Sequence, residues 1–204
     1  MELKTQCRER FKPAVDAINE IIKQEDNTDR PILVAIDGRC GSGKTTLGEY
    51  LKGQFDCNLF HMDDFFLTDN IKTPERLLEV GGNIDYDRFK NEIIMNLDKD
   101  ITYQPYNCHY HIFDKETVLP QSAVTIIEGA YALHPKFGEY YDYAIFMMIS
   151  NNQQIARIKQ RNGNEMVKIF KDRWIKLENE YFDKFDIKSR CNIIFDTSEE
   201  NKNE

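Results

Sequence analysis

The chain has 204 residues and a mass of 24.1 kDa, which is the size of one ordinary domain. A hydrophobic content of 41% excludes a disordered chain, and 10 glycines with 6 prolines exclude a collagen-like or linker-like sequence. The 35 acidic residues outnumber the 27 basic ones and give a net charge of −8, so we do not expect the broad basic face that nucleic-acid binding requires.

Neither a membrane span nor export is expected from the sequence. No uninterrupted apolar run approaches the ~20 residues that a membrane span needs. The start of the chain, MELKTQCRER, lacks the apolar core of a signal peptide. The 5 cysteines are odd in number and form no CxxC pair, which favours reduced thiols over a disulfide framework. We therefore expect a cytoplasmic protein.

The first part of the chain is predicted to form a helix and then a strand–loop–helix–strand unit. Apolar residues three or four positions apart between 3 and 22 predict an amphipathic helix. The run PILVAI, at 31–36, predicts a buried parallel strand, which leads through DGRCGSGKTT into a predicted helix over 46–55. A second short buried strand, at 57–62, ends at Asp63 and Asp64.

The second part continues the alternation and inserts a small hairpin. Thr73 and Pro74 suit the N-cap and first position of a short helix, and residues 85–98 predict another. Segments 101–106 and 111–119 alternate like short strands and predict a β-hairpin outside the main sheet. Three more buried strands are predicted at 123–129, 143–150 and 192–196, and two helices at 152–161 and 165–182.

This alternation predicts an α/β fold with an open, parallel, five-stranded sheet and helices on both faces, a three-layer sandwich. Ligands of such sheets bind at the carboxyl ends of the strands. We expect an N-terminal helical extension over 1–30, a catalytic domain over 31–198 and a disordered tail over 199–204.

The strongest motif is a phosphate loop between the first strand and the following helix. Gly38, Gly43, Lys44 and Thr45 satisfy the pattern GxxxxGK[ST] in the strand–helix context that it requires. Backbone N–H groups and the helix N-terminus form an anion cradle, Lys44 reaches the β and γ phosphates, and Thr45 ligates Mg²⁺. The sequence therefore predicts that ATP binds along the loop at Gly38, Arg39, Cys40, Gly41, Ser42, Gly43, Lys44, Thr45 and Thr46.

The residues after the second strand narrow the class of nucleotide-binding protein. The DxxG and NKxD motifs of GTPase switches are absent from the sequence. The segment HMDDFF instead resembles the uridine kinase, nicotinamide riboside kinase and phosphoribulokinase group of P-loop kinases, in which the first Asp is the general base. The strand VTIIEGAYAL is similar to the family's third-strand signature. The resemblance implies the P-loop NTPase fold, Asp63 as base, and Glu128 as the acid that assists the metal.

Weaker similarities extend to the acceptor site. QPYNCHYH resembles the nucleoside-binding segment of uridine kinases, which implies that Tyr106 and His111 contact the base, with Asn107 where the family has Asp. NIDYDRF is similar to the stretch whose Asp, here Asp85, holds the ribose hydroxyls. The hairpin would then lie near the acceptor.

The segment RIKQRNG looks like the start of the family's arginine-bearing lid. This similarity implies that Arg157 and Arg161 stabilise charge on the transferred phosphate. Phosphoryl transfer requires the same parts independently: a carboxylate to accept the hydroxyl proton, a metal across the phosphates, and cations near the transferred group.

Each of these assignments has a structural alternative. The two adjacent acids could be a helix cap and a surface charge, and Glu128 could be a solvated strand-end acid. The arginine pair could belong to an ordinary charged surface, and the hairpin Tyr and His could serve packing alone. Asp37 either contacts substrate or ties down the turn. Cys40 is either a reactive thiol with a lowered pKa or an unreactive filler.

The assignments above give no role to one apolar stripe near the C-terminal end of the chain. It consists of apolar residues at helical spacing: Met166, Ile169, Phe170, Trp174, Leu177 and Tyr181. Such a stripe is typical of a helix that packs in the core or at a dimer face, so the sequence leaves open whether the chain forms a homo-oligomer. We predict an ATP- and Mg²⁺-dependent kinase of a small hydroxylated acceptor, a nucleoside such as uridine. The alternatives are a kinase of nicotinamide riboside, pantothenate or a sugar, and a non-catalytic nucleotide-binding regulator.

Overall fold

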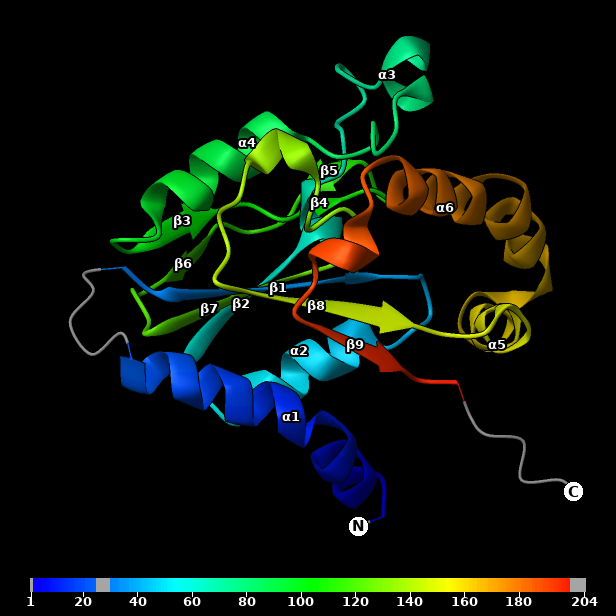
Figure 1. The fold of residues 1–204 in the computed structure, drawn as a ribbon. Coiled ribbons are helices and arrows are strands. Elements are labelled where there is room, and N and C mark those ends of the chain that lie inside the picture. Colours follow the sequence, from blue (N-terminus) through cyan, green and yellow to red (C-terminus); the bar gives the residue numbers. More distant parts are fainter. Residues whose placement is uncertain (1, 25–29, 199–204) are drawn as a thin grey trace, which may run out of the picture.

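Five parallel strands form the central sheet of the computed structural model, which describes residues 2–24 and 30–198 (Figure 1). The expected tail over 199–204 lies outside the described residues. The sheet has the order β2-β7-β1-β8-β9. Its strands are β1 (Ile32–Gly38), β2 (Cys57–His61), β7 (Val124–Glu128), β8 (Tyr143–Met148) and β9 (Ile193–Asp196). The predicted α/β fold with a parallel five-stranded sheet is confirmed.

Helices cover both faces of this sheet because its central strands are apolar on both sides (Figure 1). On one face lie α1 (Glu2–Gln24) and α2 (Lys44–Lys52). Phe11, Ala14 and Ile18 of α1 are buried there against the sheet, so the N-terminal helix completes this face. The opposite face is covered by α4 (Tyr86–Glu92) and α6 (Ile175–Lys184).

Between β2 and β7 the chain forms short elements beside the sheet. Thr73 accepts a hydrogen bond from the Arg76 N–H and Pro74 begins α3, as the sequence predicts. Two antiparallel pairs, β3 with β6 and β4 with β5, form the expected hairpin outside the main sheet. The elements are η1 (Met62–Phe65), α3 (Pro74–Leu78), η2 (Ile94–Asn96), β3 (Ile101–Tyr103), β4 (Tyr106–Asn107), β5 (Ile112–Phe113) and β6 (Thr117–Leu119). A further short turn, η3 (Pro135–Phe137), follows β7.

After β8 the chain forms one long helical arm, the α5–α6 arm, before η5 (Ile187–Arg190) and β9 (Figure 1). It consists of α5 (Asn151–Ile169), a π-helical turn η4 (Phe170–Trp174) and α6. Gly163 interrupts it with φ 83° and ψ 170°, a conformation that essentially only glycine adopts. The two predicted helices therefore exist, but they join into one element that bends at Gly163.

None of the helices in the described part of the chain has the length and apolar character that crossing a bilayer would require.

Candidate active site

The phosphate loop, residues 38–45, connects β1 to α2. Gly38, Gly41 and Gly43 have φ values of 134°, 74° and 94°, which disfavour any residue with a Cβ. A Cβ on Gly38 would lie 2.2 Å from the carbonyl oxygen of Met147 in the neighbouring strand β8. The glycine pattern therefore reflects both a left-handed backbone and a close approach between strands.

Lys44 lies inside this loop. Its Nζ donates to the carbonyl oxygens of Gly38 at 2.7 Å and Arg39 at 3.1 Å, and the side chain is buried. The N–H groups at the start of α2 have no partner within the helix, because an α-helix bonds each N–H to the carbonyl four residues earlier. A buried ammonium thus lies at the N-terminus of α2, where the first N–H groups have no partner within the helix.

The arm holds the loop from the other side. Gln154 donates to the carbonyl oxygen of Cys40 at 3.0 Å, and Arg157 donates to that of Gly41 at 3.1 Å. Arg157 also donates to the backbone oxygen of Thr197 at 2.9 Å, after β9. Arg157, expected beside the transferred phosphate, thus braces the loop, and the side chain also lines the adjoining cavity.

Glu178 of α6 makes a contact that the sequence did not indicate. Its carboxylate, only 5% exposed, accepts the backbone N–H of Cys40 at 3.1 Å. Burial, followed by the charge of Glu178, raises the pKa of the Cys40 thiol to about 12. Of the two alternatives considered from the sequence, the unreactive thiol fits, because burial and the Glu178 carboxylate outweigh the nearby positive charge of Lys44.

Asp37, at the end of β1, ties down the turn. It is fully buried and accepts hydrogen bonds from the N–H groups of Gly38 at 2.6 Å and Leu133 at 3.0 Å, and from the Tyr181 hydroxyl at 2.7 Å. Of the two roles considered from the sequence, these contacts fit the structural one.

Thr45 and Glu128 meet at the N-terminus of α2. The Thr45 hydroxyl donates to Glu128 Oε1 at 3.0 Å, and the same oxygen lies 2.6 Å from Nδ1 of His61. The sheet register causes the second contact, because His61 of β2 pairs directly with Glu128 of β7. Hydrogen bonding to Glu128 raises the pKa of His61. Sequence reasoning found Thr45 and Glu128 but missed His61, whose position opposite Glu128 depends on strand order.

Asp63 lies in η1, directly after β2, and its side chain opens on a cavity that it shares with Lys44. The surrounding cavity wall raises the pKa of Asp63 by limiting its hydration, and the negative charge of Glu128 raises it further. Lys44 and Arg161 act in the opposite direction. Catalytic carboxyl groups typically occur in this environment, a cleft in which charges of both signs lie nearby.

Arg88 of α4 fixes the segment around Asp63. Its guanidinium donates to the carbonyl oxygen of Asp64 at 2.5 Å and to that of Gln104 at 2.6 Å. It also lies over the Phe65 ring, 4.4 Å from the centroid. The backbone beside Asp63 is thereby tied to α4 and to the start of the hairpin.

The large cavity, with a volume of about 920 Å³, brings most of the predicted site together. One side is lined by Lys44, Thr45, Asp63 and Glu128, and the α5–α6 arm forms another. The arm contributes Arg157, Arg161, Met166, Phe170, Trp174 and Glu178. The expectation that this apolar stripe is core is wrong for Met166, Phe170 and Trp174, which line the cavity, whereas Tyr181 is core. The alternative of a dimer face stays a prediction.

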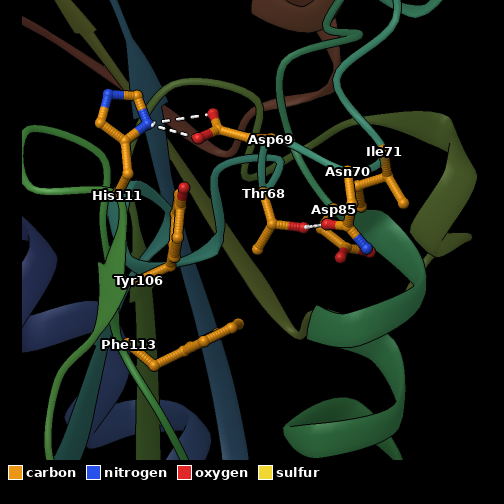
Figure 2. Close-up of a pocket in the computed structure, with 8 residues that line it drawn as sticks. All are labelled: Thr68, Asp69, Asn70, Ile71, Asp85, Tyr106, His111 and Phe113. Atoms are coloured by element: carbon orange, nitrogen blue, oxygen red, sulfur yellow. Dashed lines mark hydrogen bonds and ion pairs between the residues drawn. The ribbon is translucent and has the colours of Figure 1, made fainter.

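A second, small cavity of about 570 Å³ collects the residues expected at the acceptor (Figure 2). Asp85, Tyr106 and His111 all line it, but Asp63 does not. Asp85 caps α4 by accepting the Arg88 N–H at 3.0 Å, and the His111 ring lies 2.9 Å from a carboxylate oxygen of Asp69. The three residues are therefore grouped as predicted, yet they face a cavity separate from that of Asp63.

Comparison with known proteins identifies the family. No family model matches the chain. A uridine kinase from Clostridium botulinum (strain Okra / Type B1) is 30% identical over 149 residues, which cover 67% of this chain and 71% of the relative. This chain belongs to the uridine kinase-like P-loop kinases. A second uridine kinase, from Clostridium botulinum (strain Langeland / NCTC 10281 / Type F), has the same identity and coverage.

A solved structure agrees with the fold of these kinases. The structure described as a "possible uridine kinase" from Bacillus stearothermophilus has a TM-score of 0.69 and 21% identity, and the match covers 96% of this chain and all of that one. As a member of the uridine kinase-like P-loop kinases, the chain is a kinase. Lys44 of its phosphate loop, Asp63 and Glu128 line one cavity.

Proposed function

We propose that this kinase transfers the γ-phosphate of ATP to a hydroxyl of a small acceptor, a nucleoside such as uridine, with Asp63 as general base. The observation that supports this most is a single cavity that contains Lys44, Thr45, Asp63, Glu128 and Arg161. Phosphoryl transfer needs a phosphate cradle, a metal site and a carboxylate beside the reacting hydroxyl, and each has a counterpart there.

The phosphate loop fits a nucleoside triphosphate. Three glycines with positive φ leave three positions of the loop without a Cβ atom, and the first N–H groups of α2 point out of the helix at its positive end. Lys44 adds a buried positive charge against the loop carbonyls. These groups would hold the phosphate chain of ATP and neutralise part of its charge.

Thr45 and Glu128 fit Mg²⁺. Within the described residues, no group of three or more His, Cys, Asp or Glu side chains could hold a metal. A hydroxyl and a carboxylate 3.0 Å apart suit a hard cation that takes its other ligands from water and phosphate. An Mg²⁺ ion held there would offset part of the negative charge of the phosphates. His61 would hold Glu128 in place.

Asp63 would take the proton of the acceptor hydroxyl. Its raised pKa makes it a better proton acceptor than an ordinary Asp carboxylate. Arg161 lies close enough for its charge to act on Asp63, so the arm can place a cation beside the transferred group. Asp85, Tyr106 and His111 remain predicted acceptor contacts, in the small cavity.

The test is ADP formation from ATP and Mg²⁺ across a panel of nucleosides, nicotinamide riboside, pantothenate and sugars, with products identified by mass. We expect acceptor-dependent ADP and a phosphorylated nucleoside, and a fall of about 10²-fold in kcat/KM for Lys44→Ala. Nucleotide binding without turnover with any acceptor would instead identify a regulator and refute the proposal.

A further inference from the structure

The phosphate loop carries a buried carboxylate that the proposed mechanism does not use. Glu178 projects from α6 to the loop, where it accepts the backbone N–H of Cys40 at 3.1 Å. It is 5% exposed, and no lysine, arginine or histidine among the described residues forms an ion pair with it. Burying a carboxylate without an ion-pair partner costs free energy, so this contact points to a function of the charge itself.

The N–H group that Glu178 holds belongs to the predicted anion cradle. Cys40 stands within the GxxxxGK[ST] motif, and both Cys40 and Glu178 line the large cavity. The backbone N–H groups of such a loop are the donors that bind phosphate oxygens. A carboxylate oxygen of the chain itself therefore takes a donor of the kind that a phosphate oxygen would use.

Lys44 connects Glu178 to the same anion site through its charge. Burial raises the pKa of Glu178, and the positive charge of Lys44 acts in the opposite direction. Lys44 is also the residue expected to reach the β and γ phosphates of a nucleotide. Phosphates bound to the loop would therefore share the charge that now supports the Glu178 carboxylate, and would add negative charges of their own beside it.

Resting on the proposed function, in which the loop binds ATP, we propose that Glu178 is a built-in competitor of the nucleotide. Its carboxylate holds a loop N–H before ATP binds and opposes the approach of the phosphates. The consequence for the reaction is a lower affinity for both ATP and ADP, which favours departure of the product. Removing the charge at Glu178 should then strengthen nucleotide binding, the reverse of what the loss of a structural contact would do.

The substitution Glu178→Gln separates the charge from the contact. An amide has nearly the shape of a carboxylate, and its oxygen can still accept the Cys40 N–H, so the loop keeps its link to α6. Like charges in a desolvated site repel each other strongly, so we expect the Kd of ATP and of ADP to fall about tenfold in Glu178→Gln. Isothermal titration calorimetry with Mg²⁺ and without acceptor measures both constants.

The matched control is Glu180→Gln. It removes the same charge from the same helix, but Glu180 is exposed and lines neither cavity. Its Kd for ATP should stay near the wild-type value, because any effect of net charge alone would appear in this variant as well. Thermal melting followed by circular dichroism checks that both variants are folded.

Steady-state kinetics provide a second readout. In Glu178→Gln the ATP KM should fall, whereas the acceptor KM should stay near that of the wild type. This difference is expected because Glu178 contacts the phosphate loop and does not line the small cavity, where the predicted acceptor contacts lie. A general distortion of the protein would change both constants.

Two outcomes would overturn the inference while leaving the kinase activity intact. Unchanged or weaker ATP binding in Glu178→Gln, beside normal binding by the wild type, would assign Glu178 a structural role. An equal gain in Glu180→Gln would attribute the effect to net charge. A wild type that binds neither ATP nor ADP would instead refute the proposed function, and this inference with it.

Discussion

Replacing Tyr181 with Phe should measure how strongly the arm is anchored to the end of β1. The Tyr181 hydroxyl, fully buried, donates at 2.7 Å to Asp37, a carboxylate that is also fully buried. The Phe ring would keep the contacts with Tyr131 and His134, whose centroids lie 4.8 and 5.7 Å away, so no cavity opens. The change therefore removes one charge-assisted hydrogen bond and little else.

The expected cost follows from the charge on Asp37. Hydrogen bonds to charged groups contribute roughly 1.5–3 kcal/mol, and the buried carboxylate would keep only the N–H groups of Gly38 and Leu133. We expect a loss of about 2 kcal/mol in the free energy of unfolding. For a chain of this size, that loss corresponds to a fall in Tm of about 4–8 °C.

The loss should depend on pH. Burial raises the pKa of Asp37 above 3.8, and the Tyr181 hydroxyl works against this rise, so Tyr181→Phe raises that pKa further. A carboxyl whose pKa is higher in the folded state contributes most stability below its unfolded pKa and loses that contribution as the pH rises through the folded pKa. The deficit of Tyr181→Phe should therefore be larger at pH 7 than near pH 4.

Urea denaturation of the wild type and two variants would check this. Tyr140→Phe is the matched control, because it removes a hydroxyl that donates to the neutral carbonyl of Ala132 at 2.8 Å. That loss should be about 1 kcal/mol and independent of the charge on Asp37. A cost for Tyr181→Phe no larger than that for Tyr140→Phe, or one that does not vary with pH, would refute the argument.

Three further outcomes are expected. Gly163→Ala should lower stability by about 1–3 kcal/mol and raise the acceptor KM, because it strains the bend in the arm. Gly138 has a similar φ of 73° and ψ of −164° but lies outside the site, so Gly138→Ala should lower stability alone. Equal effects of the two variants on the acceptor KM would contradict this. Cys40, whose thiol pKa is raised to about 12, should resist alkylation at pH 8 in the folded protein and react in urea, as mass spectrometry of its peptide would show. Asp63→Asn should increase stability at pH 7, since the raised pKa of Asp63 means that its charge opposes folding. That gain should vanish below about pH 4, and a loss of stability at pH 7 in urea denaturation would contradict it.

The strands and the phosphate loop could be predicted because their signals are local. The run over 31–36 is apolar on both sides of the strand, and the glycines of GxxxxGK[ST] stand where the backbone has positive φ. Asp63 and Glu128 follow such runs directly, so a parallel sheet brings both to one edge.

The remaining features depend on contacts between distant segments. Glu178 reaches Cys40 across 138 positions, and His61 meets Glu128 only through the order of strands in the sheet. The stripe that includes Phe170 and Trp174 has the same periodicity whether it faces a core or a cavity. Sequence reasoning therefore placed this stripe in the interior or at a dimer face, and did not predict that three of its side chains line the cavity.

The most direct test of the proposed kinase site is the comparison of Asp63→Asn with Asp64→Asn. The two neighbours differ in position: Asp63 lines the large cavity, whereas Asp64 lines neither cavity. Acceptor-dependent ADP formation should fall by about 10²- to 10⁴-fold in kcat for Asp63→Asn, with ATP affinity nearly unchanged, and stay near the wild-type rate for Asp64→Asn. Wild-type turnover in Asp63→Asn would contradict the assignment of the base and, with it, the proposed mechanism.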